Sequence, residues 1–238
     1  KIFCMKCSKV SIITPCLNSE KTIRDTIESV LRQTYKNIEY IIVDGGSTDN
    51  TISIIEEYIP LFQGRMRYVS EKDRGIYDAM NKGIKMSRGC LIGIINSDDY
   101  YEDTAVEKVV CRYRRNSEQV IYGYLGLLLG NNRVKIQNFS HKNLNQNMIP
   151  HPTCFVTRKV YQKYGLFRRG FKITADYELM VRLYEKNVEF IQIPEVLANF
   201  RIGGMSSSNR TLIEKNTVKL LYRYISFREY INLLRGMD

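Results

Sequence analysis

The chain has 238 residues, of which 44% are hydrophobic, and it carries a formal net charge of +11. That length and apolar content can fill the core of one large domain, which excludes a disordered chain. The longest apolar runs fall far short of the roughly 20 residues that a membrane-spanning helix needs, so no span is predicted. The positive charge indicates an anionic partner, such as a phosphorylated substrate, a nucleic acid or an acidic lipid surface.

Six cysteines and a basic N-terminal segment bear on where the protein works. Three of the cysteines sit in apolar stretches, where a thiol behaves as a small buried hydrophobe, and this favours a reducing compartment. Cys4 and Cys7 have the C-x-x-C spacing, but the absence of a second pair or a nearby histidine argues against a zinc or redox role. Segment 1–9 has no small-residue cleavage site and is not expected to be a secretory signal. The sequence therefore predicts a cytoplasmic protein.

Four strand-and-helix units follow one another along the first half of the chain. Each unit has a β-branched apolar run, a polar turn and then apolar residues spaced three or four apart. The predicted strands cover 10–14, 40–46, 66–71 and 91–96, and the predicted helices cover 23–31, 52–59, 76–86 and 104–115. This alternation predicts an α/β fold with a mostly parallel central sheet flanked by helices.

The second half of the chain is less regular. Strands are predicted at 120–129 and 133–139, and a helix at 175–187. From residue 208 onward, apolar residues recur every three or four positions with Lys and Arg beside them, which predicts an amphipathic C-terminal helix. We expect one domain at 1–207, composed of halves 1–115 and 116–207, followed by a helical extension at 208–238.

Polar side chains follow each of the first four predicted strands. In open parallel sheets, ligands bind at the carboxyl ends of the strands. The polar groups at those ends are residues 15–18, 44–47, 71–75 and 98–99. Each group alone is typical of a turn or a helix cap. Four of them on one edge of a sheet favour a binding site.

Asp98 and Asp99 form the most informative of these groups. Two adjacent carboxylates at a strand end can hold Mn²⁺ or Mg²⁺, which takes its remaining ligands from substrate phosphates and water. Without a cation the two carboxylates repel one another unless one is protonated. Either residue also suits a helix cap. Asp44 and Asp73 supply acceptors for the base and ribose of a nucleotide.

Two residues of the second half have alternative interpretations. His151 lies between two prolines, and Asp176 lies at the start of the predicted helix 175–187, just ahead of YELMVRLYEK. A single histidine is often structural, and an aspartate at a helix start is often an N-cap. The chain has neither a P-loop nor the glycine fingerprint of dinucleotide-binding folds, which argues against a P-loop NTPase and against a dinucleotide-dependent dehydrogenase.

The resemblance of the chain to a known family rests on seven segments, which occur in this order: VSIITPCLN, YIIVDGGSTDNT, EKDRGIYDAMNKG, IINSDD, HPTCF, TADYELMVRLY and FRIGGMS. The sequence resembles the bacterial glycosyltransferase family 2 enzymes with the GT-A fold, over residues 10–206. It is similar in particular to the branch that adds sugars in colanic acid, O-antigen and capsule assembly. The resemblance implies an inverting transfer from a nucleoside-diphosphate sugar, with UDP expected, to a hydroxyl of a glycan or polyprenyl-diphosphate-linked acceptor.

The resemblance also implies a role for each matching residue. Asp176 matches the catalytic base, and Asp99 matches the direct metal ligand, with Asp98 beside it. The positions that match donor-binding residues are Pro15, Asn18, Asp44, Asp73, Arg74, Asn81 and Asp98. The positions that match residues near the diphosphate or acceptor are His151, Arg201, Gly203 and Gly204. Many members have Glu before the base, whereas this chain has Ala175 and lacks that carboxylate.

Two other functions compete with sugar transfer. A sugar-nucleotide pyrophosphorylase would carry a glycine-rich, arginine-containing loop after the first strand, where this chain has TPCLNSEKT. A nucleic-acid-binding protein is supported by charge alone, because no segment combines a basic stripe with stacking aromatic residues. No nucleic-acid partner is therefore expected.

The basic C-terminal helix has three candidate partners. Polyprenyl-linked acceptors lie at the inner face of the plasma membrane, and an apolar stripe flanked by Lys and Arg suits an anionic lipid surface. The same stripe is equally suited to packing on the domain itself or on a second copy of the chain in a homodimer. The sequence leaves these alternatives open.

Overall fold

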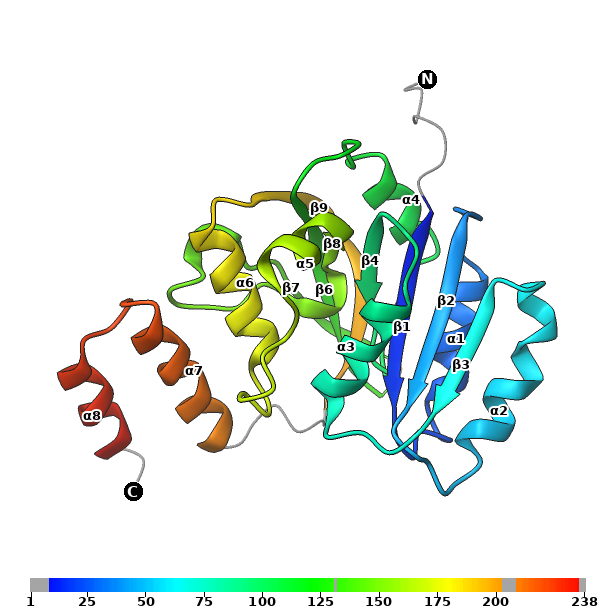
Figure 1. Cartoon of the computed structure of the whole chain (residues 1–238), viewed down its shortest axis with the longest axis horizontal. Helices are drawn as coiled ribbons and strands as arrows, with labels where there is room; N and C mark the ends of the chain where they lie inside the picture. The colour runs from blue at the N-terminus through cyan, green and yellow to red at the C-terminus, as the bar shows by residue number, and fades with distance from the viewer. Residues whose placement is uncertain (1–8, 131, 203–208, 236–238) are drawn as a thin grey trace.

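The computed structural model of the chain describes residues 9–130, 132–202 and 209–235 (Figure 1). One central sheet runs through the molecule, with helices packed on both of its faces. The strands are β1 (Val10–Cys16), β2 (Ile38–Asp44), β3 (Met66–Ser70), β4 (Leu91–Ile94), β5 (Tyr100–Tyr101), β6 (Gln119–Leu129), β7 (Asn132–Gln137), β8 (Phe155–Thr157) and β9 (Glu189–Arg201). The helices are α1 (Ile23–Leu31), α2 (Thr51–Tyr58), α3 (Ile76–Met86), α4 (Ala105–Val110), α5 (Arg158–Tyr164), α6 (Ala175–Glu185), α7 (Asn209–Leu221) and α8 (Phe227–Arg235). Three short 3₁₀ turns are η1 (Pro60–Phe62), η2 (His141–Asn143) and η3 (His151–Thr153).

The central strands β1 and β2 are buried at every position. Successive side chains of a strand point to opposite faces, so Ile12 packs into the core under α1, α2 and α4, while Ile13 packs under α3, α5 and α6. Each isoleucine fully buried in this way contributes about 2 kcal/mol of hydrophobic free energy. Helices on both faces explain why these strands are continuous apolar runs rather than alternating ones.

The sheet is parallel in its first half and mixed beyond it. Its strand order is β3-β2-β1-β4-β8-β6-β9-β5, with β7 paired to the outer part of β6. Strands β3, β2, β1 and β4 are parallel neighbours, as the sequence predicted. Strand β8 is antiparallel to both β4 and β6, and β5 and β7 also join antiparallel. The expectation of a mostly parallel sheet therefore holds for the first half, whereas the second half is mixed, since β6 and β9 are parallel neighbours while β5, β7 and β8 join antiparallel.

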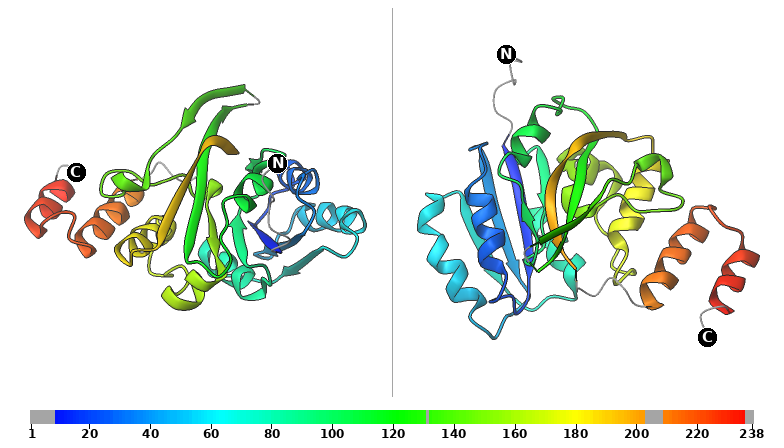
Figure 2. Two further views of the ribbon diagram at one scale, coloured as in Figure 1. Left: turned by 90° about the horizontal axis from the view of Figure 1, so that it is seen from above. Right: turned by 180° about the vertical axis from the view of Figure 1, so that it is seen from behind.

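Strand β9 was not predicted, although it is the longest strand of the sheet, with 13 residues. Pro194 and Glu195 interrupt its apolar pattern, and prolines in strands are confined to edges and bulges. The register confirms an irregularity here, since Tyr122 faces Gln192 but Tyr124 faces Val196. The hairpin of β6 and β7 projects beyond the rest of the sheet (Figure 2).

The C-terminal segment forms two helices, α7 and α8, rather than one. The chain turns between them at 222–226, where Arg223 has a left-handed backbone with φ of 60°. Helix α7 packs on α6 through Val218, which is 0% exposed, whereas Ile213 of the predicted stripe faces outward. Figures 1 and 2 show α7 and α8 at the end of the molecule opposite to α2. Among the described residues, every helix is too short or too polar to cross a membrane.

Candidate active site

The loops after β1, β2 and β4 are joined to one another at the carboxyl edge of the parallel strands. Asn18 donates its backbone N–H to Ser47 Oγ at 2.8 Å, and its Oδ1 accepts the N–H of Thr48 at 2.9 Å. Asn18 adopts a left-handed backbone with φ of 49°, which asparagine tolerates better than most residues. Ser19 Oγ lies 2.8 Å from Ser97 Oγ of the loop after β4. The polar groups after these strands therefore do share one edge, as predicted.

Asp44 lies under this edge with its carboxylate fully buried. It accepts the backbone N–H groups of Gly46 and Ser47, both at 2.9 Å, and the hydroxyls of Ser47 and Ser70. Burial by itself raises the pKa of Asp44, but these hydrogen bonds outweigh it and hold the pKa below its ordinary value. Pro15 is also buried, within β1. In this structure the side chains of Pro15 and Asp44 are buried beneath the loops at this edge of the sheet, where they support the loops and do not reach the surface.

The segment after β3 approaches the turn after β2. A Cβ atom at Gly45 would lie 2.6 Å from Asp73 Oδ2, so only glycine permits this approach. Asp73 also accepts the N–H of Gly75 at 2.8 Å, while the side chain of Arg74 is exposed. Asp73 therefore lies against the turn after β2, at the carboxyl edge of β2 and β3, with Arg74 next to it in the chain.

Asn81 lies apart from the other predicted donor-binding residues. Its Nδ2 donates to Phe167 O at 2.9 Å, and its Oδ1 accepts Phe167 N–H at 3.0 Å. The side chain is buried, and both of its polar atoms are occupied by one backbone unit. The geometry thus gives Asn81 a structural contact between α3 and the segment after α5, rather than the donor contact expected from the sequence.

The two adjacent aspartates have different environments. Asp99 is 0% exposed, and its carboxylate accepts the N–H of Arg201 and the Nδ2 of Asn96, both at 3.3 Å. Burial raises the pKa of Asp99 well above its ordinary value, and the charge of Asp98 adds to that shift. Asp98 is partly exposed. Asp98 thus reaches solvent, whereas Asp99, the residue expected to face the cation, has its carboxylate enclosed by Asn96 and Arg201.

Asn96 adds an oxygen that the sequence analysis did not identify. Its Oδ1 is buried and has no hydrogen-bond partner among the described residues. A buried acceptor without a partner is costly in free energy, and a cation or a ligand donor would satisfy it. Asn96 lies two residues before Asp98, on the same loop after β4.

These oxygens agree with the chemistry of Mn²⁺ or Mg²⁺. The described residues contain no group of three or more His, Cys, Asp or Glu side chains that would form an all-protein metal cage. A hard cation that acts on a diphosphate needs no such cage, since it binds through one or two carboxylates plus phosphates and water. The carboxylate of Asp98 and the free Oδ1 of Asn96 are a donor set of that kind.

Arg201, at the end of β9, joins the loop after β4 to α1. Its Nη1 donates to the carbonyl oxygen of Asp98 at 2.6 Å, and its Nη2 forms an ion pair with Asp25. The guanidinium carbon lies 5.6 Å from the ring centre of Tyr100. Arg201 therefore lies beside the candidate metal-binding loop. Gly203 and Gly204 lie outside the described residues.

Asp176 lies in the first turn of α6 and is partly exposed. Its Oδ1 accepts the hydroxyl of Tyr77 at 2.9 Å. Burial and the charge of Asp176 raise the pKa of Tyr77 well above its ordinary value, so this hydroxyl keeps its proton. Tyr77 is the second residue of α3, which begins just past β3. This contact brings Asp176 to the same edge as the loops of the first half.

His151 lies in η3 and is 8% exposed. Burial lowers its pKa, against the opposing charge of Asp176, so the imidazole is neutral at pH 7. Its ring packs edge-on against Phe167, with 5.8 Å between the ring centres. His151 thus lies near Asp176 as a neutral group.

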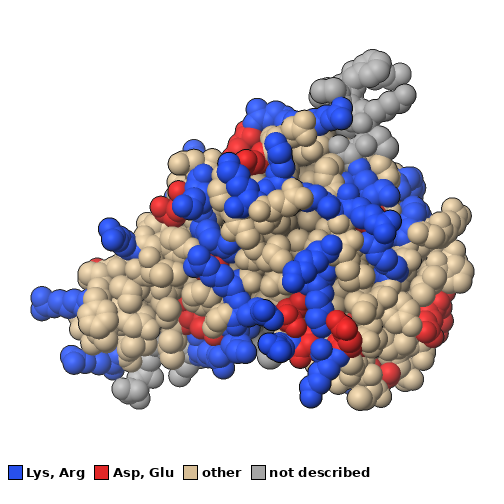
Figure 3. All heavy atoms as spheres, in the orientation of Figure 1, with Lys and Arg blue, Asp and Glu red and all other residues tan. Residues whose placement is uncertain are grey.

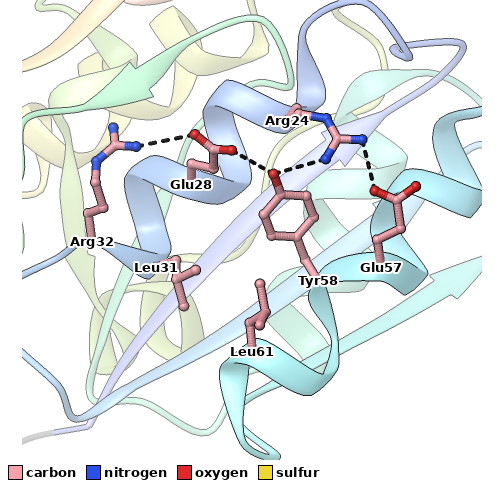
Figure 4. A pocket seen from close by; sticks show the side chains of 7 residues that line it. All are labelled: Arg24, Glu28, Leu31, Arg32, Glu57, Tyr58 and Leu61. Atoms are coloured by element: carbon pink, nitrogen blue, oxygen red, sulfur yellow. Dashed lines mark hydrogen bonds and ion pairs between the residues drawn. The ribbon is translucent and has the colours of Figure 1, made fainter.

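A surface pocket of about 440 Å³ lies elsewhere, between α1 and α2 (Figure 4). Its polar side chains bond to one another: Tyr58 OH donates to Glu28 at 2.6 Å, and Arg24 pairs with Glu57 at 2.8 Å. None of the predicted site residues lines this pocket. Its charged groups are therefore paired with one another along the surface between the two helices.

The contacts that define the site also show which residues the sequence analysis missed. Asn96, Tyr77 and Asp25 were not singled out. Asn96 sits directly ahead of Ser97-Asp98, so its place at a strand end was a usable signal. Tyr77 and Asp25 gave no such signal, because their partners Asp176 and Arg201 lie 99 and 176 positions away.

The fold and the carboxyl-edge site define an α/β protein of the nucleotide-binding type, with acidic and amide oxygens placed for a cation. Residues 11–171 match the sequence profile of glycosyl transferase family 2. The chain belongs to this family and carries its glycosyltransferase domain, as the sequence resemblance implied.

Two curated relatives illustrate the range of the family. The chain is 29% identical over 209 residues to the chondroitin synthase of Escherichia coli, covering 85% of this chain and 30% of that protein. It is 27% identical over 215 residues to a PGL/p-HBAD biosynthesis glycosyltransferase of Mycobacterium bovis, covering 89% of this chain and 83% of the relative. The chain thus spans less than a third of the first relative and most of the second.

Solved structures confirm the GT-A fold. S. aureus TarS in complex with UDP-GlcNAc superimposes with a TM-score of 0.71 at 19% identity, covering 89% of this chain and 66% of TarS. The mannosyltransferase PcManGT from Pyrobaculum calidifontis, in complex with GDP-Man and Mn²⁺, gives a TM-score of 0.72 at 16% identity, covering 92% and 66%. Both neighbours hold a nucleotide sugar, and the second also holds a divalent metal.

Proposed function

We propose that the protein is an inverting glycosyltransferase that moves a sugar from a UDP-sugar to a hydroxyl of a glycan or polyprenyl-diphosphate-linked acceptor. The observation that carries the proposal is the pairing of two groups at one edge of the sheet. Asp98, which is partly exposed, and Asn96, whose Oδ1 has no partner among the described residues, share the loop after β4, and Asp176 is tied to that edge by Tyr77. The first group suits a leaving diphosphate, and the second suits an attacking hydroxyl.

Asp98 and Asn96 are the proposed direct ligands of Mn²⁺ or Mg²⁺, in place of Asp99. Such an ion, when bound, stabilises the negative charge that develops on the departing diphosphate. Asp99 supports the loop from below through its bonds to Arg201 and Asn96. Metal-bound GT-A neighbours support a divalent cation in general, since PcManGT was solved with Mn²⁺.

Asp176 is the proposed general base. An acceptor hydroxyl is too weak an acid to attack unaided, so a carboxylate within hydrogen-bond reach takes its proton as attack proceeds. The acceptor oxygen bonds to the anomeric carbon, the bond from that carbon to the diphosphate oxygen breaks, and the nucleoside diphosphate leaves. A single base with direct displacement inverts the anomeric configuration. The hydrogen bond from Tyr77 occupies Oδ1 and leaves Oδ2 for the acceptor.

The nucleotide is proposed to lie over the loops after β1, β2 and β3. Asn18, Asp73 and Arg74 present polar side chains there, with Arg74 available to a phosphate. Pro15 and Asp44 support these loops from beneath. His151 and Arg201 flank Asp176 and Asp98 respectively, where the acceptor and diphosphate would meet. Gly203 and Gly204 keep their predicted place near the diphosphate as part of this proposal.

Synthesis of a cell-surface polysaccharide at the inner face of the plasma membrane is the proposed setting. Helices α7 and α8 expose apolar side chains, including Phe227 at 67% exposed and Leu233 at 43%, among basic residues. Such a surface suits anionic lipid. Phe227→Ser with Leu233→Ser should reduce co-sedimentation with phosphatidylglycerol vesicles, whereas Leu61→Ser, an exposed leucine on η1, should not. If both variants sediment equally, the lipid-binding hypothesis is contradicted. The alternative is then a contact between two copies of the chain in a homodimer, which light scattering detects.

The direct test of the proposed function is a panel of nucleotide sugars with Mn²⁺. Thermal shift and slow donor hydrolysis identify the donor without knowledge of the acceptor. We expect a UDP-sugar to stabilise the protein in the presence of Mn²⁺ and to be hydrolysed slowly. No stabilisation by any nucleotide sugar would contradict the proposal, as would retention of anomeric configuration in the product.

No observation specifically favours either competing function, the sugar-nucleotide pyrophosphorylase or the nucleic-acid-binding protein. The family assignment is to glycosyltransferases rather than to nucleotidyltransferases such as the pyrophosphorylases. Lys and Arg side chains are spread over the face shown in Figure 3 and do not form the single stripe that a nucleic-acid site requires. Sugar transfer is therefore the function that the site supports best.

A further inference from the structure

The segment just before α6 directs three consecutive backbone N–H groups at one carboxylate. Glu214 Oε2 accepts the N–H of Ile173 at 2.8 Å and that of Thr174 at 3.1 Å, and Oε1 accepts the N–H of Lys172 at 3.1 Å. The hydroxyl of Thr174 adds a fourth bond at 3.3 Å. Successive N–H groups that point into one concavity bind an anion. Here the anion is a side chain of α7.

Helix α6 depends on this carboxylate because its own N-cap residue does not cap it. Thr174 makes no side-chain hydrogen bond to the helix, since its hydroxyl turns to Glu214. The negative charge of Glu214 also lies at the end of α6 where the helix dipole favours an anion. Asp176 stands two residues further on, in the first turn of the same helix.

Glu214 is itself held in place. Its side chain is 12% exposed, and Arg210 Nε donates to it at 3.1 Å from one turn earlier. Burial by itself raises the pKa of Glu214, but the backbone hydrogen bonds and Arg210 outweigh it, so the group is ionised at neutral pH. Val218 and Tyr222 anchor α7 to α6, with Tyr222 OH donating to buried Glu178 at 2.6 Å. The carboxylate and the segment that it binds therefore form one packed unit.

Ile173 connects Glu214 to the proposed base. Its N–H is bound by Glu214, and its carbonyl oxygen accepts the hydroxyl of Tyr77 at 2.6 Å. The same hydroxyl lies 2.9 Å from Asp176 Oδ1. Movement of Ile173 would therefore displace Tyr77 and, with it, the carboxylate of Asp176.

We infer that Glu214 is a positioning residue for Asp176, and that α7 is a working part of the transferase rather than an appended helix. The inference rests on the proposed function for the role of Asp176 as the base. Glu214 acts through the 172–174 segment and does not touch the reacting groups. A misplacement of about 1 Å at a catalytic group costs up to roughly 100-fold in rate.

The test compares Glu214→Gln and Glu214→Ala with a matched control, Glu229→Gln. Glu229 is a carboxylate of α8 that also accepts a backbone N–H, that of Ser226 at 2.7 Å. The readout is Mn²⁺-dependent release of UDP from the most active UDP-sugar of the panel. We expect kcat to fall by about 10- to 100-fold in the Glu214 variants with the donor KM unchanged, and Glu229→Gln to match the wild type. Added formate should restore part of kcat in Glu214→Ala, which general destabilisation would not allow.

Hydrogen–deuterium exchange supplies a readout that is independent of turnover. The amides of 172–174 should exchange faster in Glu214→Ala than in the wild type or in Glu229→Gln. Unchanged exchange, or wild-type kcat in both Glu214 variants, would overturn the inference. Asp176→Asn is assayed in parallel. Wild-type turnover in Asp176→Asn would instead overturn the proposed function, so the two failures are distinguishable.

Discussion

The proposed donor side and the proposed base side of the site are held in place by different kinds of contact. On the donor side, loops that follow neighbouring parallel strands bind one another, as Asn18 binds Thr48. On the base side, Asp176 depends on Tyr77 from α3 and on Glu214 from α7, two helices that are far apart in the sequence. The comparison teaches that sheet topology alone assembles the donor side, whereas the base side requires correct packing of three separate helices.

The largest effect is expected on the base side. Asp176→Asn removes the proton acceptor and keeps the shape of the side chain, so transfer should fall by about 10²- to 10⁴-fold. Donor affinity, measured by calorimetric titration with a UDP-sugar and Mn²⁺, should stay close to that of the wild type. A large loss of donor affinity would show that Asp176 binds the donor, and it would contradict the division of the site into two sides.

A slightly smaller effect is expected from the metal-binding loop. Asp98→Ala should reduce turnover by about 10²- to 10³-fold, the scale of removing one preorganised electrostatic group. The matched variant Asp99→Asn keeps a buried group of the same shape and should cost far less. The measurement is turnover against Mn²⁺ concentration. If turnover falls more in Asp99→Asn than in Asp98→Ala, Asp99 rather than Asp98 is the direct metal ligand.

The structural support under the donor side should show itself in the pH dependence of stability. The pKa of Asp44 is lower in the folded chain than its ordinary value, so ionised Asp44 stabilises the fold above that ordinary pKa. Asp44→Asn should lower the free energy of unfolding by about 1–3 kcal/mol at pH 7. The difference should shrink as the pH falls below about 4, through the lowered pKa. Urea denaturation of both proteins at pH 7 and pH 3 measures it, and a constant difference would exclude this role.

The smallest effect is expected where one exposed side chain joins two donor loops. Asn18→Gly keeps the left-handed backbone of the turn but removes the bond to Thr48. We expect the donor KM to rise by about 2- to 12-fold, the equivalent of one hydrogen bond, with kcat and the melting temperature little changed. An effect on kcat alone would show that the two sides of the site are coupled.

The success of sequence analysis differed between the two halves for a physical reason. The alternation of apolar and polar residues reports which side of a strand or helix is buried, and it predicted α3 with the bounds that the structure shows. In the second half, strand β9 was missed because Pro194 and Glu195 break the alternation at a bulge. The C-terminal stripe was misassigned as well, since α7 buries Val218 and turns Ile213 outward.

The residues of the candidate site were also predicted in part. Placement at strand ends was enough to indicate Asn18, Asp73 and Asp98 as neighbours, because parallel strands end on one edge. The position of a residue at a strand end does not indicate whether its side chain is buried or exposed. Asp44 and Asp99 have the sequence signature of ligand-binding carboxylates, but their hydrogen bonds are directed into the protein.

By itself the sequence determined the succession of the first four strands and helices along the chain. It also determined that the acidic groups lie at the carboxyl ends of the strands, and the family to which the chain belongs. These properties depend on local periodicity and on motif order along the chain. The tertiary structure decided which aspartate reaches solvent, that Asn96 has an oxygen with no partner among the described residues, and that Tyr77 and Glu214 hold the segment carrying Asp176. Such contacts join residues that are tens of positions apart, and their geometry is fixed only when the helices pack.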